Sequence, residues 1–360
     1  MTAHLTFLES AVVGLIQGVS EMFPVSSLGH NVLIPAIVGG SWARDLNVSS
    51  PESPYLAFIV GLHVATAIAL LIYFWRDWVR IIGGFLSSVR DRRVQTTDQK
   101  LAWMIVLATI PVGLVGLAFE HTFRVLFAKP ILAGIFLVVN GLILISGERF
   151  RTRASLAADA AIAPAHDRVA QPTAGPQAVL AEPAVVGPGL VAPPTRWPAQ
   201  AAPAHGRHES GRPGSQGLRA GELADARRAD QRLAVTGYPK AVFIGSAQIL
   251  ALLAGISRDG VTMVAGMTRG MSREDAARFA FLLATPVILA AGALKIPDLM
   301  GPLGAGIRSQ ILLGSVLSGV GAYLSVRFLL RYLRTRTLTP FGVYCLIAGL
   351  ASVVYLGLIR

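Results

Sequence analysis

Two short stretches of the 360-residue sequence place titratable and nucleophilic side chains inside apolar surroundings. The first is GLIQGVSEMFPVSSLGHNVL, residues 14–33, and the second is AGISRDGVT, residues 254–262. An ionisable group in an apolar segment is unfavourable unless it is paired, so we treat such residues as candidate functional residues. Because carboxylate, hydroxyl, imidazole and guanidinium groups occur together, these residue types indicate acid–base or nucleophilic chemistry on an anion.

In the first stretch, Gln17 and Glu21 are four residues apart and therefore share one face of a helix. A proline ends this helix, and Ser26 or Ser27 is placed to cap the next one. The first turn of that second helix holds His30, within hydrogen-bonding reach of Ser27. Such a pair activates a hydroxyl or protonates a leaving oxygen, and a helix N-terminus suits phosphate. Since an amide does not titrate, we expect Gln17 to orient a neighbour.

In the second stretch, Ser257 again stands at an expected helix start. The guanidinium of Arg258 needs an anionic partner in this apolar setting, and a bidentate contact with phosphate would supply one. Gly255 and Gly260 allow the backbone to approach a ligand closely. Asp259 is read as the counter-ion of Arg258 or as a residue that faces water.

The same residues also have purely structural interpretations. Ser26 and Ser27 are explained equally by helix capping, and Glu21 by a structural ion pair with Arg258. A buried histidine such as His30 often serves only to satisfy hydrogen bonds. The sequence leaves these alternatives open.

Composition places the chain in a membrane. Hydrophobic residues make up 53% of the sequence and charged residues only 14%, against about 25% charged in an ordinary soluble domain. The net charge of +12 is gathered in runs between apolar segments, which argues against a nucleic-acid partner. The single cysteine, Cys345, cannot form an internal disulfide.

The apolar pattern predicts an all-α polytopic membrane protein with about six transmembrane helices and two re-entrant helix pairs. The expected spans are residues 54–75, 101–119, 130–147, 277–295, 308–330 and 340–358. The two broken stretches are residues 5–38 and 240–271. His63, in the first span, is expected to have a packing role.

Basic segments set the expected orientation. Residues 75–95, 147–153 and 331–337 are rich in arginine, and placing all three in the cytoplasm lets the six spans alternate. Residues 149–236 are rich in Ala, Pro, Gly and Arg, which predicts a disordered cytoplasmic insert. This insert separates a first membrane repeat, residues 1–148, from a second, residues 237–360.

An internal repeat relates the two polar stretches. At one constant offset the sequence pairs Gly14 with Gly245, Gln17 with Gln248, Ser26 with Ser257 and Gly29 with Gly260. Each copy precedes three expected spans, and because three is odd, the second copy is inverted in the membrane. Inverted repeats whose broken helices meet near the midplane can build a polar site inside a bilayer.

At these residues the sequence resembles the undecaprenyl-diphosphate phosphatase, or bacitracin-resistance, family. The family motif EGxTEFLPVSSTGH corresponds to QGVSEMFPVSSLGH, residues 17–30, and PGxSRSGxT corresponds to AGISRDGVT, residues 254–262. A third family segment, SRxxAxxFSFLLxxP, resembles the sequence from residue 272 onward. The likeness covers most of residues 5–148 and 236–358 and leaves out the insert.

The resemblance implies hydrolysis of a polyprenyl diphosphate to the monophosphate and inorganic phosphate, with a divalent cation (Mg²⁺ or Ca²⁺). It implies an inner-membrane enzyme that recycles the cell-wall lipid carrier, confers bacitracin resistance and opens its site to the periplasm. Glu21 would be the essential acidic residue and metal ligand, and Ser27 the nucleophile or phosphate ligand. His30 would be the acid–base partner and Arg258 the phosphate clamp. The expected substrate-binding residues are Gln17, Ser26, Gly29, Ser257, Gly260 and Thr262. A homodimer is compatible with the sequence, which does not set the oligomeric state.

Four positions depart from the family pattern. Gln17 stands where the family usually has a first Glu, which removes one candidate metal ligand or base. Asp259 replaces a Ser, Ala254 a Pro, and Ala280 a common Ser. These changes leave open a different substrate or a lower activity.

Two other classes compete with this reading. A polyprenyl-phosphate transporter or flippase would use the same anion site, because inverted repeats with discontinuous helices are typical of alternating access. A lipid phosphatase of the phosphatidic-acid type also pairs two such motifs, but its remaining signature elements are missing here. Phosphate release from a lipid diphosphate distinguishes hydrolysis from transport.

Overall fold

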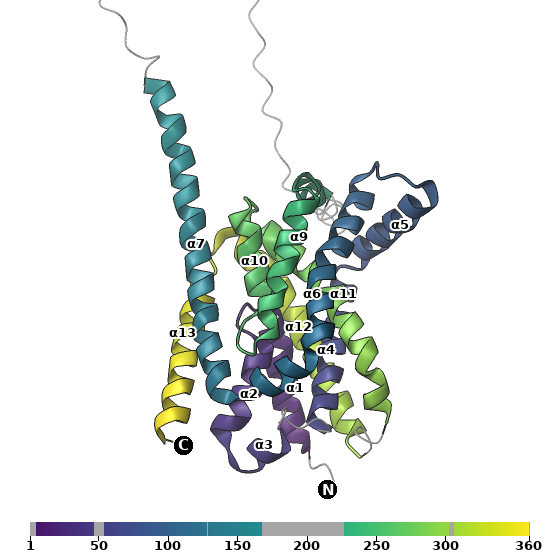
Figure 1. Cartoon of the computed structure of the whole chain (residues 1–360), viewed down its shortest axis with the longest axis vertical. Helices are drawn as coiled ribbons and strands as arrows, with labels where there is room; N and C mark the ends of the chain where they lie inside the picture. The colour runs from purple at the N-terminus through teal and green to yellow at the C-terminus, as the bar shows by residue number, and fades with distance from the viewer. Residues whose placement is uncertain (1–4, 47–53, 128, 168–226, 302–305, 360) are drawn as a thin grey trace, which may run out of the picture. The chain divides into compact units, whose positions relative to one another are not determined.

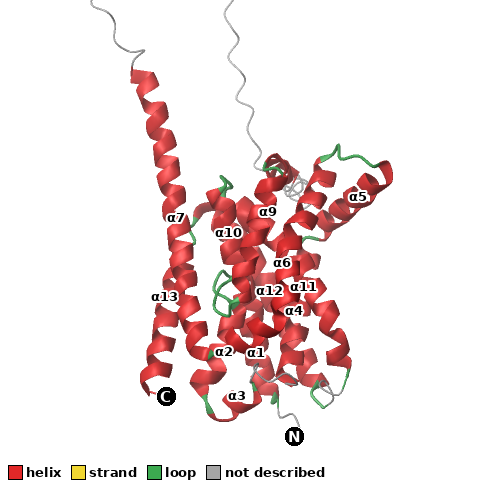
Figure 2. Cartoon of the chain, in the orientation of Figure 1, coloured by secondary structure: helices red, strands yellow, loops and turns green. Residues whose placement is uncertain are grey.

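The computed structural model describes residues 5–46, 54–127, 129–167, 227–301 and 306–359. Within these ranges all regular structure is helical and no strand occurs (Figure 2), as the all-α prediction requires. The chain divides into two compact units, Met1–Ser155 with Ala226–Arg360 and Leu156–Asp225. The first unit contains both polar stretches.

Five helices are long and apolar enough to cross a membrane, and α4 with α5 forms a bent pair that gives a sixth candidate. The helices are α4 (Pro54–Tyr73), α5 (Trp75–Asp91), α6 (Thr97–Phe127), α7 (Pro130–Asp167), α11 (Arg273–Met300), α12 (Arg308–Thr335) and α13 (Thr339–Val354), which continues as a π-helical turn, η3 (Tyr355–Ile359). All six expected spans fall on these helices. The chain is therefore a multi-pass membrane protein.

The two broken stretches form short helices separated by turns. The first contains α1 (Phe7–Met22) and α2 (Ser27–Val38), followed by α3 (Gly40–Asp45), and the second contains α9 (Tyr238–Ser246), the 3₁₀-helix η1 (Ala247–Leu252) and α10 (Arg258–Thr268). The breaks lie where the polar motifs predicted them. That each pair enters and leaves the membrane on one side, as half of an inverted repeat, stays a prediction.

Two expected boundaries need correction. Residues 75–91 of the predicted basic loop form helix α5, because apolar residues recur between the arginines at helical spacing. The predicted insert, residues 149–236, lies mostly outside the described residues, but both of its ends are helical: α7 continues to Asp167, and residues 227–235 form a further helix. Asp230 in this helix forms ion pairs with Arg80 and Arg278, which hold the helix against α5 and α11.

The halves of the chain pack across one another. Helix α1 packs mainly on α12, α4 on α11 and α12, and α6 on α9. The α1–α12 contact is close because small residues line it: a Cβ on Gly18 would overlap the backbone of Ser318, and one on Gly14 would overlap that of Gly314. Small residues permit such close approach of helices in membranes.

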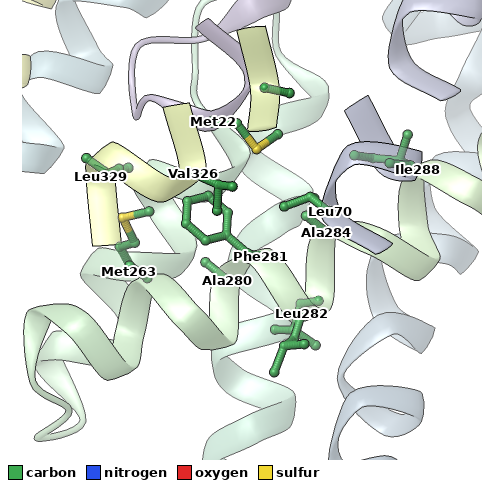
Figure 3. Packing of buried hydrophobic residues seen from close by; sticks show 14 of the residues in the cluster. Met22, Leu70, Met263, Ala280, Phe281, Leu282, Ala284, Ile288, Val326 and Leu329 are labelled. Atoms are coloured by element: carbon green, nitrogen blue, oxygen red, sulfur yellow. The ribbon is translucent and has the colours of Figure 1, made fainter. Parts of the chain in front are cut away.

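An apolar cluster supports the end of α1, just beyond Glu21. Met22, Leu70, Phe281 and Val326 are completely buried, and Figure 3 shows the Phe281 ring close to Val326 within this cluster. These side chains come from α1, α4, α11 and α12. Packing of Met22 therefore fixes the end of α1, from which Glu21 projects.

We predict that Gly18→Ala lowers the thermal midpoint of the purified protein in detergent. The added methyl group must separate α1 from α12, and such overpacking costs about 1–3 kcal/mol. Gly113→Ala is the matched control, since a Cβ there meets nothing within 4 Å, and its midpoint should be unchanged or higher. Equal midpoints for the two variants would contradict the close α1–α12 packing.

Candidate active site

The breaks of the two polar stretches touch each other. The Ser26 hydroxyl accepts hydrogen bonds from the backbone N–H groups of Gly29 and Gly255, each at 3.2 Å. Gly255 has a φ of +112°, and a Cβ there would meet the backbone of Ala133, so only glycine fits. Ser26 itself has a φ of 67°, which is strained for a non-glycine residue. Ser26 therefore caps α2 and also ties it to the second break.

Asn140, in the first third of α7, joins the same two breaks. Its Nδ2 donates to the Pro24 carbonyl at 2.9 Å, and its Oδ1 accepts from the Ser257 N–H at 3.0 Å. The side chain is completely buried. The sequence analysis did not identify Asn140, although an amide side chain inside an apolar span indicates a hydrogen bond between helices.

Glu21 is the centre of the site. Its Oε1 is paired with Arg258 Nη2, and its Oε2 accepts hydrogen bonds from Ser27 Oγ and, at 2.9 Å, from Gln17 Nε2. His63 Nε2 lies 3.5 Å from the same Oε2. The Glu21 side chain is 5% exposed, so its charge is offset by these partners and not by water. The structure thus brings together Gln17, Glu21, Ser27 and Arg258 as the sequence predicted.

Gln17 links Glu21 to one more residue. Its Oε1 accepts a hydrogen bond from Asn31 Nδ2 at 2.6 Å while its Nε2 donates to Glu21. Both ends of the amide are used, which fixes its orientation and that of the carboxylate. This geometry agrees with the orienting role expected for Gln17. Asn31, next to His30 in the sequence, was not predicted.

His30 points away from Ser27. Its Nδ1 lies 2.7 Å from the Ser26 carbonyl oxygen and its Nε2 2.7 Å from the Tyr344 hydroxyl, and the His30 and Tyr344 rings stack at 5.8 Å. Within the described residues, no hydrogen bond joins His30 to Ser27. The expected contact fails because the ring folds back toward the start of α2, while the Ser27 hydroxyl faces Glu21. The catalytic role of His30 stays a prediction.

The second break repeats the capping pattern of the first. The Ser257 hydroxyl accepts the Gly260 N–H at 3.1 Å, as Ser26 does for Gly29. Thr262, an expected substrate-binding residue, donates its hydroxyl to the Arg258 carbonyl at 2.7 Å within α10. The structure thus places Thr262 one turn after the break.

Asp259 is the least satisfied group beside the site. It is 1% exposed, and neither carboxylate oxygen has a hydrogen-bond partner among the described residues. Arg258 Nε, which also lacks such a partner, lies 3.8 Å from Asp259 Oδ1. The guanidinium thus stands between two carboxylates, Glu21 and Asp259, and is bonded to the first.

These contacts define what the arrangement can bind and do. The N-termini of α2 and α10 lie at the joined breaks, and their first N–H groups and positive dipole ends favour an anion. Arg258 adds a guanidinium suited to phosphate. A hydroxyl bonded to a carboxylate, as in Ser27 and Glu21, is the arrangement of an activated nucleophile.

The residues present do not form a ready divalent-cation site. Glu21 is the expected ligand, but both of its oxygens already have protein partners, and Gln17 supplies an amide where a second carboxylate would stand. Among the residues that the structure describes, no group of three or more His, Cys, Asp or Glu side chains could hold a metal ion.

Comparison with known proteins gives long matches. The family model described as "Bacitracin resistance protein BacA" matches residues 10–170 and 218–351. A protein named undecaprenyl-diphosphatase from Mycolicibacterium paratuberculosis is 54% identical over 358 residues, 99% of this chain and 100% of the relative. Undecaprenyl-diphosphatase 2 from Frankia alni is 53% identical over 350 residues, 96% of each chain. Undecaprenyl-diphosphatase 2 from Chromobacterium violaceum is 34% identical over 353 residues, 97% of this chain and 98% of the relative.

We predict that Asn140→Leu destabilises the junction of the two breaks. The substitution leaves the Ser257 N–H without its partner, at about 1–3 kcal/mol for a buried unsatisfied group. It leaves the Pro24 carbonyl with only the weak donor of the Cys345 thiol, at 3.9 Å. Amide hydrogen exchange should become faster at residues 253–257, and the thermal midpoint should fall. Ser352→Ala is the control, because that hydroxyl donates to the Ala348 carbonyl of its own helix at 2.7 Å. Unchanged exchange in Asn140→Leu would show that Asn140 does not hold the breaks together.

Proposed function

The chain belongs to the family described as bacitracin resistance protein BacA, and we propose that it hydrolyses undecaprenyl diphosphate to undecaprenyl monophosphate and inorganic phosphate. Relatives named undecaprenyl-diphosphatase match it at 54% and 53% identity over nearly the whole chain, and both polar stretches lie within the matched ranges. The observation that carries the proposal is the junction of Glu21, Ser27 and Arg258 at two helix N-termini. The comparisons give no support to the transport alternative.

Binding follows from the positive groups at the junction. The terminal phosphate of the substrate would take the place of Glu21 on the Arg258 guanidinium, in a bidentate contact. The N-termini of α2 and α10 would stabilise the remaining phosphate oxygens. As the substrate draws Arg258 away, the Glu21 carboxylate loses its cationic partner and becomes a stronger base.

The chemistry uses the existing bond between Ser27 and Glu21. Ser27 Oγ attacks the terminal phosphorus while its proton passes to Glu21, and the bond from that phosphorus to the bridging oxygen breaks. Undecaprenyl monophosphate leaves. Water then attacks the phosphoserine, and the bond from phosphorus to the Ser27 oxygen breaks. The Ser27 oxygen recovers its proton from Glu21, and inorganic phosphate leaves with the oxygen and both protons of the water. Positioning and charge neutralisation supply most of the catalysis in such transfers.

His30 and His63 have supporting roles in this scheme. His30 holds the strained Ser26 carbonyl and is itself held by Tyr344, so it fixes the start of α2. His63 lies beside Glu21 Oε2, where a protonated ring would stabilise the carboxylate. We propose the first as a positioning residue and the second as an electrostatic one.

The cellular setting is proposed from family membership and from charge. We propose that the enzyme lies in the inner membrane, opens its site to the periplasm, recycles the lipid carrier of cell-wall synthesis and thereby confers resistance to bacitracin. The orientation follows the positive-inside rule for the basic segments. The polyprenyl tail would lie against the apolar outer surface or between spans.

We predict that Ser27→Ala reduces turnover of undecaprenyl diphosphate by at least about 100-fold, the scale of a lost nucleophile or base. Glu21→Gln should lose as much, whereas Ser87→Ala, a hydroxyl on the distant α5, should not. Phosphate release by purified protein measures all three. A rapidly quenched reaction with labelled terminal phosphate should leave label on wild type and none on Ser27→Ala. Near-normal turnover by Ser27→Ala would instead assign the attack to water.

We predict that Gln17→Glu tightens the binding of Mg²⁺ or Ca²⁺. The change places a second carboxylate four residues from Glu21, and two close carboxylates repel unless a cation lies between them. Calorimetric titration of EDTA-treated protein should show a lower Kd than for wild type, with steeper metal dependence of turnover. Gln17→Ala is the control and should lower activity modestly with no gain in metal affinity. If Gln17→Glu binds metal no better than wild type, Glu21 is not a metal ligand.

A further inference from the structure

Helix α5 carries a row of exposed apolar side chains. Trp75, Val79, Ile82, Leu86 and Val89 are 55%, 63%, 51%, 62% and 51% exposed. They recur at spacings of four and three residues, which places them on one side of the helix. A contiguous apolar surface of this kind marks an interaction site.

The other side of α5 is fixed to the protein. Ser88 is buried and accepts a hydrogen bond from Trp103 Nε1 of α6 at 2.9 Å, and the Phe85 and Trp103 rings lie 5.2 Å apart. A Cβ on Gly84 would overlap the backbone at Asp98. The apolar row therefore cannot turn inward without loss of this packing.

A network of charges adds to this attachment. Arg80 of α5 is paired with Asp77 at 2.6 Å, with Asp98 at 3.0 Å and with Asp230 at 2.6 Å. Arg278 of α11 binds Asp77 at 3.0 Å and Asp230 at 2.9 Å. Asp230 is 1% exposed, and several shared partners in a network make such pairs more effective than isolated ones.

The direction of α5 differs from that of the spans. It is bent by 86° from α4, and Figure 1 shows it leaving the line of α4 to one side. A helix nearly perpendicular to a membrane span runs close to the membrane plane. An amphipathic helix in that plane buries its apolar face about 5–10 Å into the boundary between headgroups and acyl chains.

Basic side chains accompany the apolar row. The guanidinium of Arg76 lies over the Trp75 ring, 5.2 Å from its centroid. Arg90, Arg92 and Arg93 are exposed at the far end of the helix. Arginine beside an apolar face favours a surface of anionic lipids, by about 1 kcal/mol for each basic residue near the surface.

We infer that α5 is an interfacial anchor: its row of Trp75, Val79, Ile82, Leu86 and Val89 is immersed in the cytoplasmic leaflet, and its arginines contact anionic lipid headgroups. The lipid surface is favoured over a protein partner because the row continues the apolar surface of a membrane protein and is accompanied by basic groups. The anchor fixes the depth of α4, and hence of His63 beside Glu21.

The test is the depth of nitroxide labels in full-length protein in liposomes of phosphatidylethanolamine and phosphatidylglycerol. Labels are attached to Val79→Cys, Ile82→Cys, Leu86→Cys and Val89→Cys, with Asp91→Cys and Gln95→Cys as controls at exposed polar positions beyond the row. Wild type, whose Cys345 is buried, serves as the labelling blank. Oxygen and a water-soluble nickel complex report access from the bilayer and from water. The four row labels should lie at one shallow depth below the phosphates, and the two control labels in water.

Three outcomes would overturn the inference. Depth that increases steadily from Val79→Cys to Val89→Cys would make α5 a spanning segment. Row labels open to the nickel complex would place the row in water. Row labels that neither reagent reaches would mean that a protein surface covers the row, whether a partner or a second copy of this chain.

A second arm tests the headgroup charge. The double variant Arg92→Gln, Arg93→Gln should bring the Val89→Cys label closer to water, and so should liposomes of phosphatidylcholine alone. A label depth that is indifferent to both changes would remove the anionic-lipid contact from the proposal.

Discussion

The structure depends on one buried pair of charges, the Glu21 carboxylate and the Arg258 guanidinium. An unpaired charge in an apolar interior is very unfavourable, so each residue requires the other. The pair joins the two broken stretches across the protein, because Glu21 ends α1 and Arg258 begins α10. Gln17 and Ser27 satisfy the carboxylate further, which is why the polar residues of the first stretch gather around one oxygen.

The surrounding contacts keep this pair in place and leave it able to exchange partners. Ser26, Gly255 and Asn140 fix the two backbones at the break by hydrogen bonds to main-chain groups. Arg258, in contrast, keeps an unpartnered Nε close to Asp259. A guanidinium between two carboxylates can leave one and pair with the other, so its positive charge stays paired throughout. This is a suitable resting state for the phosphate clamp that we propose Arg258 to be.

The sequence predicted the features of the site that depend on neighbouring residues or on the need to pair a buried charge. Capping by Ser26 and Ser257 follows from their positions at helix starts, and the pairing of Glu21 with Arg258 follows from the low polarity around both. It did not predict Tyr344 as the partner of His30, because that contact joins positions 314 residues apart and depends on helix packing. Five of the expected spans fall on helices long and apolar enough to cross a membrane, and the sixth, residues 54–75, falls on α4 of the bent pair. Helix α5 was misread as a loop because its arginines obscured the apolar row between them.

The separation of Glu21 from Arg258 along the chain has a consequence for biosynthesis. The two residues are 237 positions apart, so the ribosome completes the whole first half before the partner of Glu21 exists. During that interval the polar end of α1 has no guanidinium to stabilise it in the bilayer. Helix α12, against which α1 packs, also emerges late. The first broken stretch therefore reaches its final packing only after the second half of the chain has been synthesised.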